Sequence, residues 1–120
     1  MTFQEQMEDA VKRVEGLAGA AIADSDGIVV EEYKNDSAVD LSLLVAEYGT
    51  LWNTADKAGL ACELGSAHEF NVFTDDLILV MRTIKGGYFL VFAVHSEKSF
   101  GKGRFYARII AEDLVESLDL

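Results

Sequence analysis

Hydrophobic and polar positions follow two different periods along this chain, and the change of period divides it into predicted helices and strands. Three stretches repeat apolar residues every three to four positions, which is the spacing of amphipathic helices; they cover residues 2–15, 39–58 and 102–118. Runs rich in β-branched and aromatic residues predict strands; they cover 18–24, 28–33, 60–74, 75–84 and 88–95. The predicted order is therefore helix, two strands, helix, three strands, helix.

Two short turns between predicted strands carry the glycines that hairpins need. The stretch "DSDG", residues 24–27, separates two apolar runs, and "KGG", residues 85–87, separates two more. Asp-Gly between such runs is a strong hairpin signal. The aspartates of the first turn could alternatively begin a calcium loop, but Ile28, Val29 and Val30 stand where further oxygen ligands are needed. The sequence therefore predicts a hairpin turn here and no metal site.

The predicted strands at 75–84 and 88–95 are apolar on both faces. Alternate residues of a strand point to opposite sides, and in both strands each alternate set is apolar. Strands joined by short turns pair antiparallel, and a sheet that is apolar on both faces has both faces covered. We therefore predict an α+β protein, a three-layer α/β/α sandwich in which the helices cover the two faces of an antiparallel sheet.

The predicted middle helix, residues 39–58, is more apolar than one face of a sheet requires. Its residues at three-four heptad spacing are Leu41, Leu44, Tyr48, Leu51 and Ala55, and Leu43, Val45 and Trp52 widen that line. A fully buried helix could carry this pattern, and so could a helix with one side on its own sheet and the other on a partner chain. We favour a partner chain, because a helix outside the sheet of a chain this short would otherwise expose one apolar side to water. Its aromatic residues also suit an interface core.

The strand that follows the middle helix has the polar positions of a sheet edge. Between residues 66 and 74 the polar residues Ser66, His68, Glu69 and Asn71 interrupt the apolar ones. An edge strand has unpaired backbone groups, and in a symmetric dimer it can pair with its own copy. The edge-strand residues that we expect in such a dimer interface are His68, Phe70 and Val72.

Composition narrows the range of partners. The chain has 120 residues, which fits a single domain over 1–120. With 21 acidic and 10 basic residues its formal charge is −11, so it should repel nucleic acid and anionic membranes alike. The N-terminal stretch has no hydrophobic core of a signal peptide, and no apolar run is long enough to insert into a membrane. We therefore expect a cytoplasmic protein.

Residues with catalytic or ligand chemistry are isolated from one another. Cys62, the single cysteine, lies among apolar residues and is expected to be a small core residue, although Cys62 with His68 could form a nucleophile–base pair. The stretch from His68 lacks the second histidine of a zinc motif, because Val72 stands there. The stretch "GKGR", 101–104, is not a complete phosphate-binding motif and predicts a flexible helix entry with exposed cations. We expect no catalytic, cofactor-binding or metal-binding residues, and no enzyme activity.

The whole pattern resembles the Roadblock/LC7 domain family. The segments that carry the resemblance are "VEGLAGAAIADSDGIVVEEY", an apolar helix, "HEFNVFTDDLILVMRTIKGGYFLVFAV" and "GKGRFYARIIAEDLVESL". They span nearly the whole chain, and their order and spacing are more specific than any one of them. The resemblance implies a profilin-like five-stranded antiparallel sheet with one helix on one face and two on the other. It also implies a homodimer built through the middle helix and the adjoining edge strand.

The same resemblance implies a function without catalysis. Family members serve as dynein light chains, as scaffolds of Rag-type GTPases, and as MglB-like partners of small Ras-like GTPases. A stand-alone domain most resembles the last group, some of whose members accelerate GTP hydrolysis by the GTPase. Family GTPases approach the paired middle helices, so the candidate partner surface consists of Glu47, Thr50, Asn53 and Asp56. The alternatives are a structural adaptor of a larger assembly and, less favoured, a small-molecule sensor or enzyme.

Overall fold

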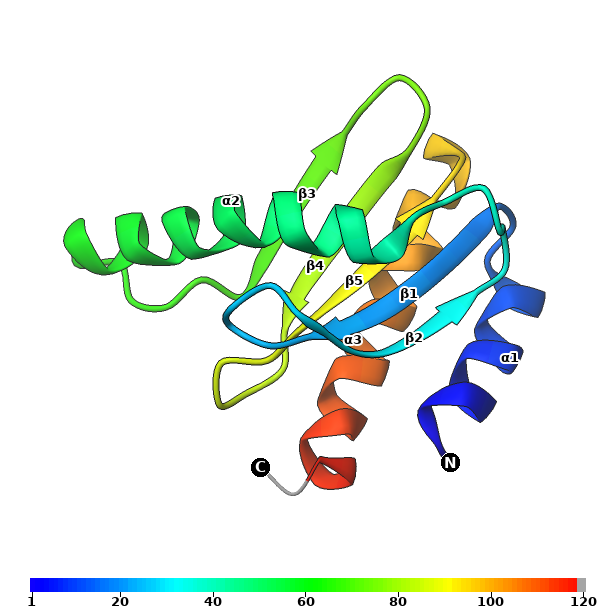
Figure 1. Cartoon of the computed structure of the whole chain (residues 1–120), viewed down its shortest axis with the longest axis horizontal. Helices are drawn as coiled ribbons and strands as arrows, with labels where there is room; N and C mark the ends of the chain where they lie inside the picture. The colour runs from blue at the N-terminus through cyan, green and yellow to red at the C-terminus, as the bar shows by residue number, and fades with distance from the viewer. Residues whose placement is uncertain (119–120) are drawn as a thin grey trace.

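The computed structural model of the chain describes residues 1–118 and has the three layers that the sequence predicts (Figure 1). Its elements are α1 (Phe3–Arg13), β1 (Leu17–Ala23), β2 (Val29–Lys34), α2 (Leu41–Ala61), β3 (Glu69–Phe73), β4 (Ile78–Thr83), β5 (Phe89–Val94), a short 3₁₀ turn (Glu97–Ser99) and α3 (Phe100–Ser117). Among these described helices, none combines the length and the apolar character of a membrane span.

The five strands form one sheet in the order β2-β1-β5-β4-β3, and every neighbouring pair is antiparallel. Strands β2 and β3 are therefore the two edges, as predicted for the strand after the middle helix. Helix α2 lies alone across one face of the sheet, while α1 and α3 lie on the other (Figure 1). The predicted α+β sandwich, with one helix on one face and two on the other, is confirmed.

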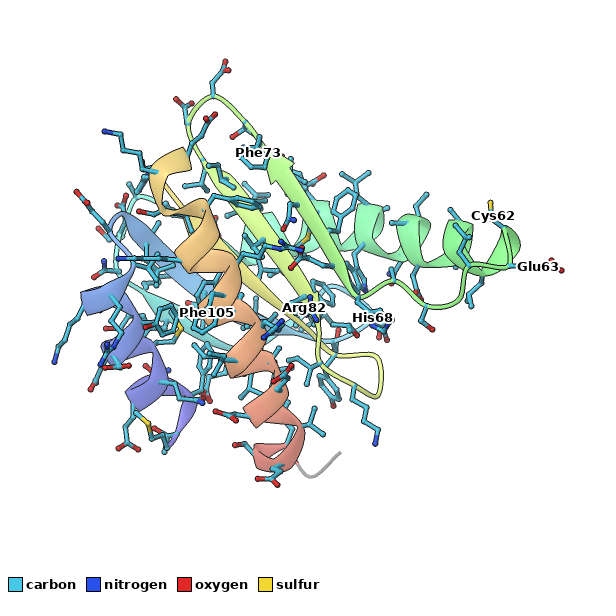
Figure 2. The ribbon with its side chains drawn as sticks, turned by 180° about the vertical axis from the view of Figure 1, so that it is seen from behind. Cys62, Glu63, His68, Phe73, Arg82 and Phe105 are labelled. Atoms are coloured by element: carbon cyan, nitrogen blue, oxygen red, sulfur yellow. The ribbon has the colours of Figure 1, made fainter. Side chains whose placement is uncertain are left out.

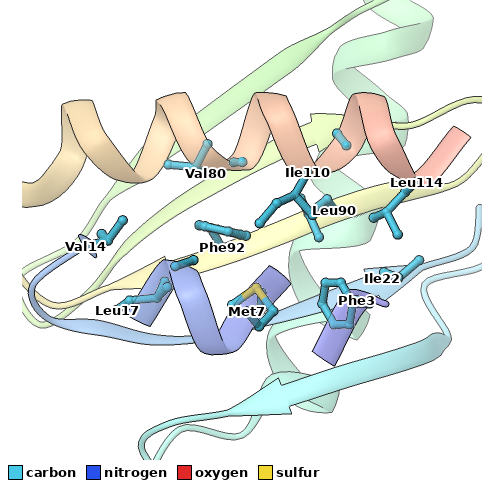
Figure 3. Packing of buried hydrophobic residues seen from close by; sticks show 14 of the residues in the cluster. Phe3, Met7, Val14, Leu17, Ile22, Val80, Leu90, Phe92, Ile110 and Leu114 are labelled. Atoms are coloured by element: carbon cyan, nitrogen blue, oxygen red, sulfur yellow. The ribbon is translucent and has the colours of Figure 1, made fainter. Parts of the chain in front are cut away.

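Each face of the sheet has its own hydrophobic core, because the inner strands are apolar on both sides. The core under α1 and α3 is drawn in Figure 3, and its labelled members are Phe3, Met7, Val14, Leu17, Ile22, Val80, Leu90, Phe92, Ile110 and Leu114. The core under α2 contains, among others, Leu41, Val45, Trp52, Leu79, Met81, Phe89, Val91 and Ala93. The alternation predicted for β4 and β5 therefore assigns their side chains to the correct opposite faces.

Helix α1 begins at a capping box. The Thr2 hydroxyl accepts a hydrogen bond from the Glu5 backbone N–H at 3.2 Å, and the Glu5 carboxylate accepts one from the Thr2 N–H at 3.1 Å. These two bonds satisfy backbone donors that a helix leaves free at its start, which stabilises the end by about 1 kcal/mol. The helix buries Phe3, Met7 and Ala10, so its apolar stripe faces the sheet as predicted.

Helix α2 begins two residues after its predicted start and runs three residues beyond its predicted end. The Asp40 carboxylate caps its start by accepting the Leu43 N–H at 3.1 Å, and Gly59, the residue after the predicted end, lies inside the helix. The helix continues to Ala61 and ends with Glu63 in the left-handed conformation, φ 61°. The Leu64 N–H then donates to the Gly59 carbonyl at 2.8 Å, which is a Schellman closure. The following strand is shorter than predicted because these residues belong to the helix and its closing turn.

The stretch 101–104 is not the flexible helix entry that the sequence predicts. Helix α3 already begins at Phe100, after the 3₁₀ turn, so all four residues are helical. Gly103 is buried, and a Cβ atom at this position would lie 3.1 Å from Cγ2 of Val94 on β5. The glycine therefore serves close packing of α3 on the sheet. The buried stripe of α3 runs through Gly103, Ala107, Ile110, Ala111 and Leu114, which leaves Phe105 exposed.

Candidate protein interface

One of the two carboxylates of the β1–β2 turn, that of Asp24, is used by the turn itself. Asp24 Oδ1 accepts the backbone N–H groups of Asp26 and Ile28 at 2.9 and 3.1 Å, and the Asp24 carbonyl accepts the Gly27 N–H at 3.0 Å. Gly27 has φ 78°, a conformation that glycine adopts at little cost. The predicted hairpin turn is confirmed. Within residues 1–118, no group of three or more acidic, histidine or cysteine side chains is arranged to hold a metal ion.

The cysteine and the two histidines lie at element ends. Cys62 is exposed at the end of α2, so the expectation of a small core residue is wrong; the helix carries it away from the sheet (Figure 2). His68 is exposed just before β3, and its carbonyl accepts the Thr83 N–H at 3.0 Å. His95 Nε2 lies 2.8 Å from Oδ2 of Asp36. A hydrogen bond from the Ala38 amide, and then this one, lower the pKa of the Asp36 carboxyl.

The outer side of α2 is apolar and lies open. Leu43 and Leu51 are 57% and 47% exposed, in positions where a helix of a monomeric domain normally carries polar side chains. With the half-buried Leu44 and Tyr48, and with Glu47 and Thr50, they line a hollow of about 600 Å³. Apolar hollows of this kind on a helix surface are typical of protein–protein contact.

Half of α2 extends beyond the sheet. The buried residues of the helix are Leu41, Val45, Gly49 and Trp52, and none of residues 53–61 is buried. Figure 1 shows the second half of the helix continuing past the edge strand β3. At its far end Leu60 is 55% exposed and Leu64 is 81% exposed. We call this part of α2 with its closing turn, residues 53–64, the overhang.

The structure corrects two members of the interface set predicted on the middle helix. Leu41 and Trp52 are buried in the chain's own core, and the Trp52 ring stacks on Phe89 at a centroid distance of 5.8 Å. They cannot be the exposed anchors of a contact with another chain. Leu44, Tyr48 and Ala55 are half-buried and Leu51 is exposed, so these four stay available. Sequence reasoning missed Leu60 and Leu64, because the apolar run around them predicts a strand.

Strand β3 contributes the second part of the candidate interface. Among the strands of residues 1–118 it pairs only with β4, so the backbone groups on its other side have no partner strand there. Phe70 and Val72 are half-buried and lie on the α2 face, opposite Met81 and Leu79 of β4. His68 precedes the strand and is exposed. The edge strand β3 and the outer side of α2 are thus the two parts of the candidate interface, and each corresponds to one of the two predicted residue sets.

Two of the four residues predicted to face a GTPase have intramolecular roles. Asn53 Nδ2 donates to the Ser25 carbonyl at 2.9 Å, which ties α2 to the β1–β2 turn. Asp56 Oδ1 accepts the Ala67 N–H at 2.8 Å, which ties the overhang to the segment before β3. Glu47 and Thr50 are exposed on the helix, so their side chains are accessible to a partner.

The described residues thus form a three-layer α/β/α domain whose exposed leucines, Leu43, Leu51, Leu60 and Leu64, all lie on α2 or its closing turn. No protein-family model matches the chain, and no curated protein sequence does. Solved structures do match. A Roadblock/LC7 domain from Streptomyces avermitilis superposes with a TM-score of 0.85 at 18% identity, covering 100% of both chains. MglB from Myxococcus xanthus superposes with a TM-score of 0.81 at 11% identity, covering 99% of this chain and 98% of that one.

At such identities these two structures establish the fold alone. MglC from Myxococcus xanthus is more similar in sequence: it is 31% identical with a TM-score of 0.67, covering 98% of this chain and 99% of that one. The chain belongs to the Roadblock/LC7 domain family, as its sequence pattern predicts.

Proposed function

We propose that this chain is a homodimeric, non-catalytic regulator or scaffold of a small Ras-like GTPase, acting as a single Roadblock/LC7 domain over residues 1–120 in the cytoplasm. The observation that carries the proposal is the overhang, half a helix with no core of its own beside an unpaired edge strand. The likeness to MglB and MglC supports the GTPase as partner.

A second copy of the chain fits this surface. Two β3 strands related by a twofold axis would pair antiparallel and join the two sheets. Each overhang would then lie across the partner's sheet edge, where Leu51, Leu60 and Leu64 would lose their contact with water. Burying about 100 Å² of apolar side chain stabilises a contact by about 2.5 kcal/mol, so a few leucines per chain can hold such a pair together.

The dimer is tested by charge placed on the outer side of α2. Light scattering should give the unmodified protein twice the 13.1 kDa mass of one chain. Leu51→Asp should give a folded monomer, because a buried carboxylate without a partner is strongly unfavourable at an interface. Val30→Asp is the matched control, because Val30 is 50% exposed on the opposite edge strand β2. A monomeric unmodified protein contradicts the proposal.

The GTPase is tested by titration. A purified small Ras-like GTPase, loaded with GTP or with GDP, should bind the dimer and change its rate of GTP hydrolysis or nucleotide exchange. Glu47→Lys reverses an exposed charge on α2 and should weaken binding, whereas Glu8→Lys makes the same change on α1, across the sheet. If neither binding nor rate depends on the protein, the GTPase part of the proposal is wrong while the dimer stands.

A further inference from the structure

The arginines of this acidic chain are concentrated at one place. Of its four arginines, Arg82, Arg104 and Arg108 line a single cavity of about 310 Å³ between the β3–β4 edge and α3. The lining is completed by Glu69, Gly101 and Phe105. The fourth arginine, Arg13, lies on α1 and pairs with Asp9 at 3.1 Å. We call the cavity the arginine pocket.

One carboxylate holds the inner part of the arginine pocket together. Glu69 Oε2 accepts Arg104 Nε at 2.6 Å and Asn71 Nδ2 at 3.0 Å, and Glu69 Oε1 accepts Arg82 Nη1 at 3.3 Å. The Glu69 side chain is only 12% exposed. The lining therefore sets three positive charges against one negative charge, which leaves two positive charges uncompensated within it.

In the outer part of the pocket, Arg104 and Arg108 have guanidinium N–H donors that are accessible to a ligand. The side chains of Arg104 and Arg108 are 56% and 54% exposed, and they lie one helical turn apart on α3. Within the part of the chain that the structure describes, the one ion pair of Arg108 is a loose 3.9 Å contact with the exposed Glu112. Each guanidinium offers five N–H donors in a planar fork that matches a carboxylate. Phe105, 52% exposed, lies in the same lining and offers an apolar contact.

The charges and the occupied inner part of the arginine pocket favour one class of anionic ligand over the others. A small free anion would find the point where Arg82 and Arg104 converge already occupied by Glu69. A nucleic acid or an anionic membrane would meet a chain whose formal charge is −11. A short peptide can instead place two carboxylates on the spaced guanidinium groups and an apolar side chain on Phe105, while the rest of it stays clear of the acidic surface.

We propose that the arginine pocket docks a short acidic peptide segment of a partner protein, with carboxylates on Arg104 and Arg108 and an apolar side chain against Phe105. The pocket lies on the side of the sheet that α3 covers, whereas α2 lies on the opposite face (Figure 2). This docking site is therefore separate from the outer side of α2 and goes beyond the GTPase scaffold proposed above.

The test uses a fluorescein-labelled peptide of glutamate and leucine, followed by fluorescence anisotropy at physiological ionic strength. At that ionic strength the Debye length is about 8 Å, so the rest of the acidic surface repels the peptide little. Arg108→Glu should weaken binding about tenfold or more, as expected for losing a charge-assisted bond. Arg13→Glu changes the net charge equally outside the pocket and should leave binding within about twofold. Light scattering of the same samples follows the assembly state independently.

Three results would overturn the proposal. Equal weakening by Arg108→Glu and Arg13→Glu would show a general charge effect. Equal binding of a peptide with glutamine in place of glutamate would show that the carboxylates are not recognised. Displacement of the peptide by inorganic phosphate or GTP at lower concentration than by unlabelled peptide would assign the pocket to a small anion.

Discussion

Glu63 shows at the scale of one residue how α2 ends. It has φ 61°, the left-handed conformation that closes the helix, and this conformation is less favourable for a side chain than for glycine. Its carboxylate also lies at the negative end of the helix dipole. The left-handed conformation of Glu63 therefore lowers the free energy of unfolding, and a substitution at this position can measure by how much.

Glu63→Gly should raise the free energy of unfolding by about 1 kcal/mol, because glycine adopts the left-handed conformation without a Cβ contact. Urea unfolding at one fixed protein concentration measures the difference. Glu63→Ala is the matched control, because it removes the carboxylate but keeps the Cβ atom. Equal stability of the two variants would show that the backbone conformation of residue 63 is not strained.

At the scale of the element, some apolar residues of α2 pack on the sheet and others are exposed to solvent. The first half anchors the helix on the sheet, with Val45 and Trp52 buried in the core. The outer side and the overhang keep leucines in contact with solvent. Leu51 and Trp52 are neighbours in sequence but lie on different sides of the helix, because successive residues are about 100° apart around its axis. Substitutions at these two positions should therefore report different properties.

Trp52→Ala should lower the free energy of unfolding by about 3–5 kcal/mol, the range for removing a large buried aromatic side chain. The indole is 6% exposed and stacks on Phe89 with an interplanar angle of 20°. Leu51→Ala, at the exposed neighbouring position, should cost the isolated chain less than about 1 kcal/mol. Urea unfolding of both variants, at a protein concentration low enough for the chains to be monomeric by light scattering, makes the comparison. An unchanged midpoint for Trp52→Ala would contradict the packing described here.

At the scale of the whole molecule, Glu69 links the sheet edge to α3. Partial burial acts to raise its pKa, but hydrogen bonds from Asn71 and Arg104, with the charges of Arg104 and Arg82, lower it overall. A carboxyl whose folded pKa is below its unfolded value contributes stability above the unfolded pKa. That contribution is lost as the pH falls through the folded pKa.

The stability of the protein should therefore decline below about pH 4.5, the ordinary pKa of a glutamate, as Glu69 takes up a proton. Glu69→Gln removes this titration, so its free energy of unfolding should be lower than that of the unmodified protein at pH 7 and should fall less steeply in acid. Urea unfolding between pH 3 and pH 7 measures both. Parallel curves for the two proteins would show that the Glu69 carboxylate does not stabilise the fold.

Much of the fold could be predicted from the sequence, since it depends on local chemistry. The period of apolar residues identifies the three helices and the inner strands, and the Asp24 carboxylate and Gly27 form their turn within a few residues. The helix ends were predicted less well. Gly59 looks like a stop but lies inside α2, because the closing bonds come from Glu63 and Leu64 further along the chain.

By itself, the sequence determined the order of elements, the antiparallel pairing, the two-sided sheet and the excess of apolar residues on α2, because these follow from periodicity and turn chemistry. Only the tertiary structure decided which of those residues stay exposed, because that depends on the angle at which α2 crosses the sheet. It therefore placed Trp52 inside and Leu51 outside. It also brought Arg82, Arg104 and Arg108 from β4 and α3 to one carboxylate-centred pocket, a contact between segments distant in sequence that no local pattern encodes.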